Sequence, residues 1–337
     1  MRIYTRASLK RLAAAFALIA IAVIWGLGCM VAMPGRSHRG PLPPLTADQE
    51  KLAVELRRDV DHLASQIGER NVYQYAAYQR AAAFIESSLK GAGYEVSQQT
   101  FDVDGRACVN LEVELTGRLQ ADRIVVVGAH YDTVSGSPGA NDNATAVAGL
   151  LALARRFVDR RPERTLRFVA FANEEPPFFQ TPHMGSYVYA ERCRRRQELV
   201  VAMIAFDGLG FYSDEENSQK YPPPFSLLYP SRGNFIGIVG NLGSRRLVRR
   251  VIGVFRTHAA FPSEGAAMPG SIEGAGWSDH WSFWHHGYQA VMVSDTLPFR
   301  YPHYHTGGDT PDKLDLNRTA RVVAGLEAVV GDLAGTD

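Results

Sequence analysis

The chain has 337 residues, and its 36 Lys and Arg residues nearly balance its 35 Asp and Glu residues. The chain therefore has no excess of positive charge that would bind a polyanion, and we expect no nucleic-acid partner. No Cys-x-x-Cys pair occurs among the three cysteines, which argues against a thiolate metal site. A disulfide between Cys108 and Cys193 is compatible with the sequence, but their spacing does not decide whether it forms.

The amino terminus has the features of a membrane anchor. Residues 1–11 form a basic segment, and residues 12–33 form an uncharged, apolar stretch long enough to cross a hydrocarbon core. Positive charge ahead of this stretch predicts a cytoplasmic amino terminus and a body on the exported side, either periplasmic or extracellular. A cleaved signal peptide is the alternative interpretation. Residues 34–45, rich in proline and glycine, then form a tether to a domain over residues 46–337.

The elements of this domain alternate between helix and strand. Apolar periodicity predicts helices over residues 46–67, 73–90, 144–159, 245–257 and 317–333. It predicts a hairpin over 94–103 and 108–115 and further strands over 124–129, 165–172, 200–206, 225–228, 235–239 and 289–294. No linker divides the chain. The alternation therefore indicates one α/β domain with a central mixed, mostly parallel sheet between helix layers.

The most informative stretch is the apolar run 124–129, which ends in His130 and is followed by Asp132 and Asp142. Consecutive β-branched residues predict a strand buried on both faces, as in parallel sheets. Ligands bind at the carboxyl edge of such sheets, so His130 and Asp142 are candidate metal ligands. Asp132 could accept a hydrogen bond from the ring nitrogen that faces away from the metal. An ordinary loop, with Asp142 capping the next helix, is the alternative.

Two further strands lead to acidic residues. Strand 165–172 is followed by Glu174-Glu175, and strand 200–206 is followed by Asp207. Consecutive side chains of an extended segment point to opposite sides. One glutamate can therefore bind a metal while the other reaches a reacting water. A solvated acidic loop is the alternative for the glutamate pair, and the argument against it is the convergence of several strands on one edge.

Residues 301–310 supply another histidine beside an acidic residue, with His303 and His305 as rivals for the ligand position. We prefer His305 because a His-Thr-x-x-Asp-Thr pattern starts there. Two histidines and three carboxylates exceed the needs of one tetrahedral zinc ion. They suit a two-metal site in which one carboxylate bridges both ions. The set contains no thiolate, so zinc, manganese and cobalt all remain candidates.

In order and context, the candidate residues resemble the di-zinc aminopeptidase family that includes bacterial leucyl aminopeptidase and glutamate carboxypeptidase II: His130-x-Asp132, Asp142, Glu174-Glu175, Asp207 and His305-Thr306. The resemblance covers about residues 45–335 and implies a zinc exopeptidase fold with two Zn²⁺ ions. It implies that His130 and Asp207 bind one ion. Glu175 and His305 would bind the other, and Asp142 would bridge the two.

The resemblance also implies roles for neighbouring residues. Glu174 would be the general base, Asp132 the partner of the first histidine, and Tyr304 a group that stabilises the tetrahedral intermediate. Asp279 matches a family pattern near the site and is expected to support a metal-binding loop. The peptide bond that follows Asp142 is expected to be cis, as the family has it.

The leading functional hypothesis is a membrane-anchored, exported zinc aminopeptidase that removes the first residue of a peptide substrate. A zinc-bridged hydroxide would attack the carbonyl, and Glu174 would carry its proton to the leaving amine. A Pro-Pro-Phe-Phe run over residues 176–179 replaces the glycine-rich residues usual in the family, so substrate preference and the terminus cleaved stay open. The alternatives are a glutaminyl cyclase-like acyltransferase, which works with one zinc, and a catalytically inactive binding ectodomain. We predict no protein partner.

Overall fold

The computed structural model describes residues 6–336. Its body is built on an eight-stranded mixed sheet with the order β1-β2-β4-β3-β5-β8-β6-β7. The central strands β4, β3, β5 and β8 are mutually parallel, and antiparallel pairings join β1 to β2, β2 to β4 and β8 to β6. The strands are β1 (Ser97–Val103), β2 (Arg106–Leu115), β3 (Gln120–His130), β4 (Arg164–Phe171), β5 (Leu199–Phe206), β6 (Ile236–Asn241), β7 (Ser263–Met268) and β8 (Ala290–Ser294).

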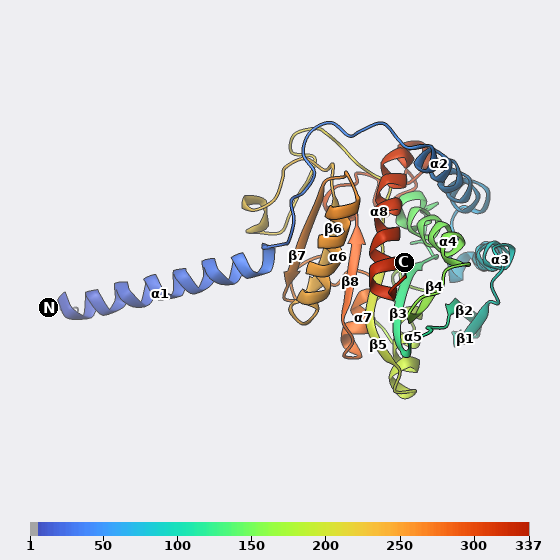
Figure 1. Ribbon diagram of the computed structural model, residues 1–337, viewed down its shortest axis with the longest axis horizontal. Helices are drawn as coiled ribbons and strands as arrows, with labels where there is room; N and C mark the ends of the chain where they lie inside the picture. Colours follow the sequence, from blue (N-terminus) through green and yellow to red (C-terminus); the bar gives the residue numbers. More distant parts are fainter. Residues whose placement is uncertain (1–5, 337) are drawn as a thin grey trace.

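Helices cover both faces of this sheet (Figure 1). One layer contains α2 (Ala47–Val60), α3 (Tyr75–Gly91), α4 (Thr145–Phe157), α6 (Arg245–His258) and α8 (Leu316–Ala334); the other contains α5 (Gly185–Arg195) and α7 (His280–His285). Along β3, Val125 and Val127 join the core under the first layer, whereas Ile124 and Val126 join the core under the second. Both faces of β3 are therefore buried, which explains its unbroken apolar run. The predicted single α/β domain is confirmed.

A capping box is present at the start of the domain. Thr46 Oγ1 accepts a hydrogen bond from the backbone N–H of Gln49, and Gln49 Oε1 accepts one from the backbone N–H of Thr46. The predicted helix 46–67 consists of α2 followed by a π-helical turn, Asp61–Ile67. This turn leads directly into the segment that supports the candidate site.

Several sequence-based predictions were wrong or incomplete. The strand predicted over residues 225–228 is a 3₁₀ turn, η4 (Phe225–Leu227), because it follows three consecutive prolines that cannot donate to a ladder. β7 was missed because Gly265 and its alanine neighbours have little β propensity, although β6 pairs with them. α5 and α7 were missed as well. Cys108 and Cys193 are both free, so the disulfide that the sequence left open does not form.

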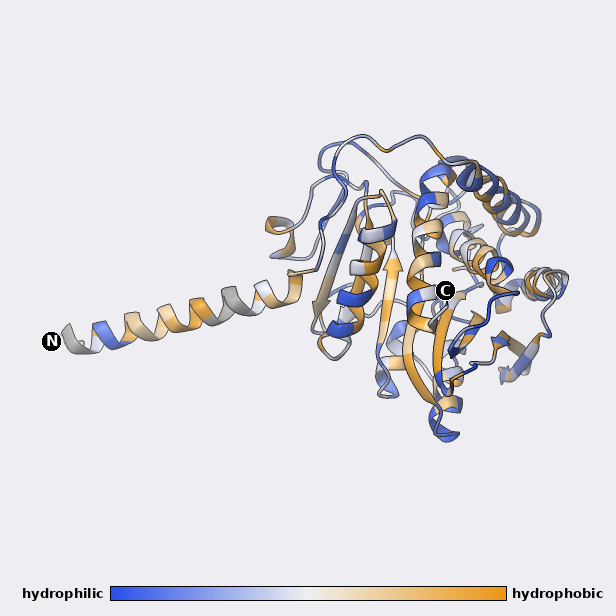
Figure 2. Cartoon of the chain, in the orientation of Figure 1, coloured by the Kyte–Doolittle hydropathy of each residue, from blue (hydrophilic) through white to orange (hydrophobic). Residues whose placement is uncertain are grey.

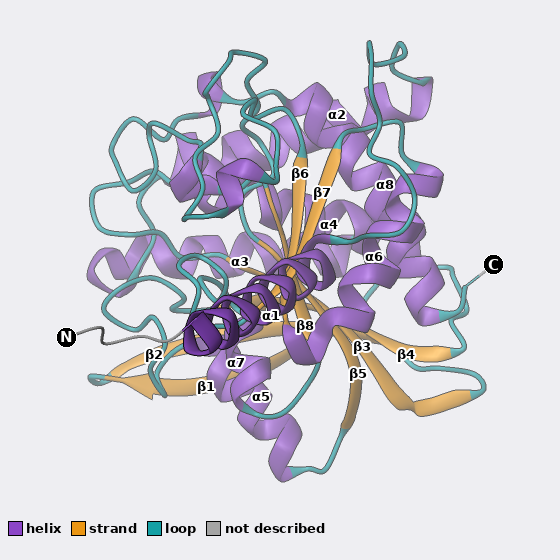
Figure 3. Ribbon diagram, turned by 90° about the vertical axis from the view of Figure 1, so that its left-hand side faces the viewer, coloured by secondary structure: helices purple, strands orange, loops and turns teal. Residues whose placement is uncertain are grey.

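The helix α1 (Arg6–Val31) projects from the body, and Figure 3 looks along it toward the twisted sheet. Its residues Ser8–Val31 are long and apolar enough to cross a membrane or to serve as a signal sequence, as Figure 2 shows by colour. Arg2, a member of the predicted basic segment, lies outside the described residues. Residues 34–45 run along the body, where Arg256 donates to the carbonyl of Pro34 and Ser37 accepts from the backbone of Ser263.

Gly128 of β3 provides a test of this packing. A Cβ atom at Gly128 would stand 2.2 Å from Cε2 of Phe171, whose ring is buried against Tyr189 and Phe283. We expect Gly128→Ala to lower the free energy of unfolding by about 1–3 kcal/mol, a typical cost of overpacking. The matched control is Gly91→Ala at the end of α3, where a Cβ meets nothing within 4 Å. Thermal unfolding of the two variants should differ clearly, and equal melting temperatures would contradict this account.

Candidate metal centre

The candidate ligands come from neighbouring segments at one edge of the sheet. His130 is the last residue of β3, Asp207 follows β5, and Glu175 lies four residues beyond β4. Because β4, β3 and β5 are adjacent and parallel, their carboxyl ends meet at the same edge. Asp142 lies in the turn η3 (Ala140–Ala144) that precedes α4, and His305 lies in the loop after β8.

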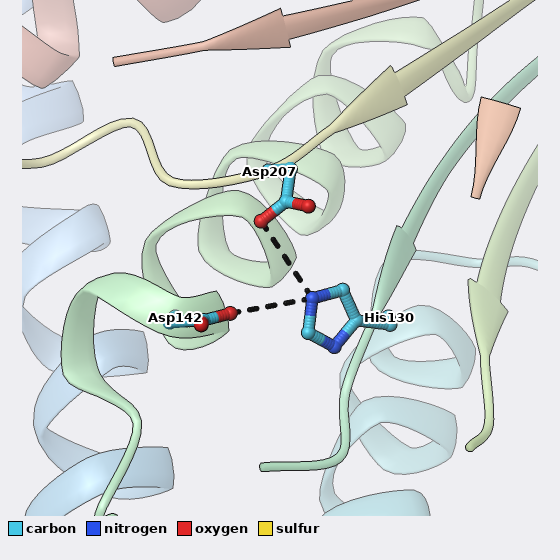
Figure 4. Close-up of side chains that lie close together, drawn as sticks. All are labelled: His130, Asp142 and Asp207. Carbon is cyan, nitrogen blue, oxygen red and sulfur yellow. Dashed lines mark ion pairs between the residues drawn. The ribbon is translucent and has the colours of Figure 1, made fainter. Parts of the chain in front are cut away.

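These side chains form two groups that share one aspartate. His130 Nε2 lies 3.4 Å from Asp142 Oδ1 and 3.7 Å from Asp207 Oδ1 (Figure 4). His305 Nε2 lies 3.1 Å from Asp142 Oδ2 and 3.1 Å from Glu175 Oε2. The two oxygens of Asp142 therefore face different histidines. This is the arrangement required of a carboxylate that bridges two ions.

The hydrogen bonding of the first group suits a metal ion. Neither ring nitrogen of His130 has a hydrogen-bond partner among the described residues, and neither does Asp207 Oδ1, although all three atoms are buried. Buried polar atoms are normally paired, so these atoms call for another partner. Imidazole and carboxylate together suit zinc. The residues present therefore fit the ion.

Asp132 organises the glutamate pair. Its Oδ1 accepts the backbone N–H of Glu174 at 3.0 Å, and its Oδ2 accepts that of Glu175 at 3.1 Å. Asp132 Oδ1 also lies 3.5 Å from His130 Nδ1. The sequence suggested only this last contact. The structure adds that one carboxylate fixes the backbone of two candidate functional residues, while Glu175 Oε1 accepts the N–H of Val134.

Three supporting residues escaped the sequence analysis. Asp309 accepts the backbone N–H groups of Asn141 and Asp142 at 2.8 and 3.0 Å, one with each carboxylate oxygen. The fully buried Arg70 donates to the carbonyls of residues 131, 138 and 139. The Asn143 side chain donates to the carbonyl of Phe206 and accepts from the backbone N–H of Gly208, the residues on either side of Asp207. Only Asp309 had a sequence signal, as the aspartate of the His-Thr-x-x-Asp-Thr pattern. The Asp142–Asn143 bond is cis, as expected.

The charges of the cluster shift its pKa values in opposite directions. Burial, with the nearby carboxylates, raises the pKa of Glu174 well above its ordinary value and that of Glu175 to about 7. Burial also disfavours the charged form of Asp142, but hydrogen bonds from His130 and His305 outweigh this effect and lower its pKa. The site thus concentrates more carboxylates than imidazoles in a buried space. Such an excess of negative charge favours divalent cations.

The remaining predicted residues lie around the two groups. Tyr304 stacks on His305, with ring centroids 3.8 Å apart, and lines the cavity in front of the site. His303 belongs to neither group and instead lies edge-on to Tyr301. Asp279 is fully buried at the start of α7, and burial raises its pKa to about 7.

A cavity of about 390 Å³ opens onto the cluster. Asp142, Glu174, Glu175, Asp207 and His305 line one end of it. The rest of its wall is mainly apolar and aromatic and includes Phe179, Tyr221, Phe225, Phe235, Met268, Trp277, Met292 and Phe299. Ligand pockets commonly have this size and combine an apolar lining with a few converging polar groups.

Comparisons with known proteins identify the family of this chain. Residues 110–330 match Peptidase family M28. A protein of Escherichia coli K12, described as "Uncharacterized protein YfbL", is 35% identical over 282 residues, which cover 81% of this chain and 85% of that protein. Aminopeptidase YwaD of Bacillus subtilis is 35% identical over a shorter stretch of 74 residues, 22% of this chain and 16% of that protein.

Solved structures share the fold at low sequence identity. A zinc aminopeptidase from Bacillus subtilis superposes with a TM-score of 0.65 at 16% identity, covering 83% of this chain and 94% of that chain. A glutaminyl cyclase from Fimbriiglobus ruber gives a TM-score of 0.61 at 18% identity, covering 89% and 99%. The fold therefore does not separate these two activities. The family match over most of the body does identify the class: this chain belongs to peptidase family M28 and is a metallopeptidase.

Proposed function

We propose that the protein is an aminopeptidase that holds two zinc ions and is anchored by α1, with its body on the exported side of a membrane. The observation that carries the two-ion site is the position of Asp142, whose two oxygens face different histidines. In this proposal His130 and Asp207 hold one ion, and Glu175 and His305 hold the other. Zinc bound there supplies Lewis-acid polarisation of the scissile carbonyl and activation of water at neutral pH.

Glu174 is the proposed general base. Its carboxylate lines the cavity and comes within 3.9 Å of His130 Nε2, yet it belongs to neither ligand group. A carboxylate placed beside the reacting atoms but free of the ions can take a proton from water and deliver it to the leaving amine. Asp132 holds the backbone of Glu174 and so sets the position of the base.

Tyr304 is the proposed stabiliser of the developing oxyanion. Its ring stacks on His305, which keeps its side chain at the cavity wall. Burial and the surrounding carboxylates raise the pKa of Tyr304, so its hydroxyl stays protonated and able to donate a hydrogen bond.

The charge of the cavity favours the amino end of a peptide over the carboxyl end. Among the described residues that line it, the carboxylates outnumber the cations, and Lys220 is the only lysine or arginine. With the three ligand carboxylates neutralised by bound ions, Glu174, Glu264 and Glu273 remain in the wall to attract a free α-ammonium group, whereas Lys220 is the one side-chain ammonium there for a free carboxylate. A glutaminyl cyclase-like acyltransferase is the second candidate, because two glutaminyl cyclases share the fold. The number of bound ions separates these candidates.

The first prediction from this proposal is a content of two zinc ions per chain. Elemental analysis of zinc-loaded, dialysed protein should give two ions, because the two ligand groups share only Asp142. His305→Ala should retain one ion, since it removes a ligand of one group. The matched control is His303→Ala, which leaves both groups intact and should retain two. One ion with full peptidase activity in the unmodified protein would overturn the two-ion proposal.

The second prediction separates the two glutamates. Glu175→Gln should weaken zinc binding, because a neutral amide replaces a carboxylate ligand. Glu174→Gln should keep both ions and the fold but lose about 10²- to 10⁴-fold in kcat, because an amide cannot carry the proton. Zinc content and kcat on a leucyl 4-nitroanilide substrate measure both effects. Near-normal kcat in Glu174→Gln, with zinc-loaded but inactive Glu175→Gln, would reverse the two roles.

The third prediction concerns Asp309, which touches neither ion in the proposal. In Asp309→Asn an amide NH₂ group must face one of the two backbone N–H donors, so the loop that carries Asp142 should shift. We expect zinc affinity to fall about 10- to 100-fold, as for other groups that orient ligands. Asp312→Asn, an exposed carboxylate in the same loop, is the control. Competition with a fluorescent chelator measures both variants, and equal affinities would contradict the role of Asp309.

A further inference from the structure

The cavity is much larger than the side chain of leucine requires. Its volume is about 390 Å³, and the part beyond the ligand cluster is walled mostly by apolar and aromatic groups. Three of these, Tyr221, Phe225 and Tyr229, come from the segment 221–229 and stack on one another with ring centroids 5.7 and 6.2 Å apart. This segment therefore forms a continuous aromatic wall at the far end of the cavity.

The same wall contacts the end of the apolar helix α1. Met30 and Val31, the last residues of α1, pack against a cluster that contains Phe225, Ala266 and Met268. All three of these cluster residues line the cavity. If α1 crosses a bilayer, its last turn lies at the membrane surface. One thin apolar wall then separates that surface from the cavity.

Basic side chains fix this end of α1 to the body. Arg245 donates from Nε to the carbonyl of Cys29 at 2.9 Å, and Arg249 donates to the carbonyl of Ala32. Both arginines belong to α6, so the helix end is joined to the domain by polar bonds as well as apolar contacts. These bonds hold the last turn of α1 in a fixed position against α6.

The tip of the aromatic segment exposes two leucines. Leu227 is 85% exposed and Leu228 is 44% exposed, although Phe225 beside them is buried. In Figure 1 the short gold turn of this segment lies on the side of the body from which α1 projects, and Figure 2 colours it apolar. Adjacent exposed leucines at the tip of a turn next to an anchor are typical of a segment that enters the membrane interface.

We propose that residues 221–229 lie in the bilayer surface and that the cavity accepts membrane-partitioned substrates whose first residue carries a long apolar side chain. This inference rests on the proposed function and on retention of α1 as an anchor. The aromatic wall places the apolar end of the cavity next to the acyl chains, while the carboxylates at the other end hold the polar head of the substrate. Leu227 and Leu228 insert into the bilayer surface and hold the segment there, and they lie away from the reacting atoms.

The first experiment tests the seating without using activity. The full chain carries Cys29→Ser with Leu227→Cys, labelled with a polarity-sensitive fluorophore and reconstituted in phosphatidylcholine–phosphatidylglycerol nanodiscs. Cys108 and Cys193 are buried and should not label. We expect a blue-shifted emission that spin-labelled lipid quenches. The matched control, Val54→Cys, is 70% exposed on α2, at the opposite end of the body from α1, and should show neither effect.

Two outcomes overturn the seating. Emission at position 227 that matches position 54 means that the tip stays in water. A blue shift that spin-labelled lipid does not quench means that the tip is covered by protein, either a second copy of this chain or another partner.

The second experiment tests the substrate class with two anilides that share the scissile bond. In nanodiscs, kcat/KM for 2-aminododecanoyl 4-nitroanilide should exceed that for leucyl 4-nitroanilide by at least about tenfold, since even one methylene group in an apolar pocket changes kcat/KM by about 10-fold or more. The double variant Leu227→Ser/Leu228→Ser should reduce the long-chain value and leave the leucyl value unchanged. Equal values for the two anilides, with the leucyl substrate cleaved, refute this inference alone. Failure to cleave either anilide refutes the proposed aminopeptidase, while the fluorescence result still stands by itself.

Discussion

The two hydrogen bonds from the backbone of Asn141 and Asp142 to Asp309 are the interaction on which the rest of the site depends. They fix the turn that carries Asp142, whose two carboxylate oxygens face different histidines. A shift of this turn would therefore disturb both ligand groups together. Tyr301 donates its hydroxyl to the same carboxylate, which ties the turn to the loop that carries His305. A carboxylate that accepts three donors is held rigidly, and rigid support of ligands is what a metal site requires.

The ligand cluster also creates an electrostatic cost within the fold. Asp142, Glu174, Glu175 and Asp207 are all buried within the same few ångströms, and only two imidazoles stand among them. Like charges brought together in a poorly solvated space repel, and burial removes the water that would screen them. Bound cations relieve this repulsion, so metal binding and folding stability are coupled in a site of this composition.

How much of this could be read from the sequence depends on whether the interaction was local. The apolar run ending in His130 and the acidic residues after two further strands were sufficient to predict where the ligand cluster lies, because the carboxyl ends of adjacent parallel strands meet at one edge of the sheet. Arg70 could not be found in this way, since three of the carbonyls that it binds lie more than sixty positions away and a backbone carbonyl is present at every residue. β7 and the turn η4 were misread for a different reason. The small residues of β7 form a strand because they pair with β6. The apolar residues of η4 form none, because prolines precede them.

The bonded path of residues 34–45 has a mechanical consequence. A free chain of about 12 residues has a root-mean-square span of roughly 20 Å, so a body held by it would tumble and sweep a wide volume above the membrane. Here the carbonyls of Pro34 and Pro43 accept from Arg256 and Arg321, and Leu42 packs against the core, which removes that slack. With α1 retained as the proposed anchor, the body would stand at one height and in one orientation over the bilayer. The opening of its cavity would then stay within a thin layer at a fixed distance from the membrane surface.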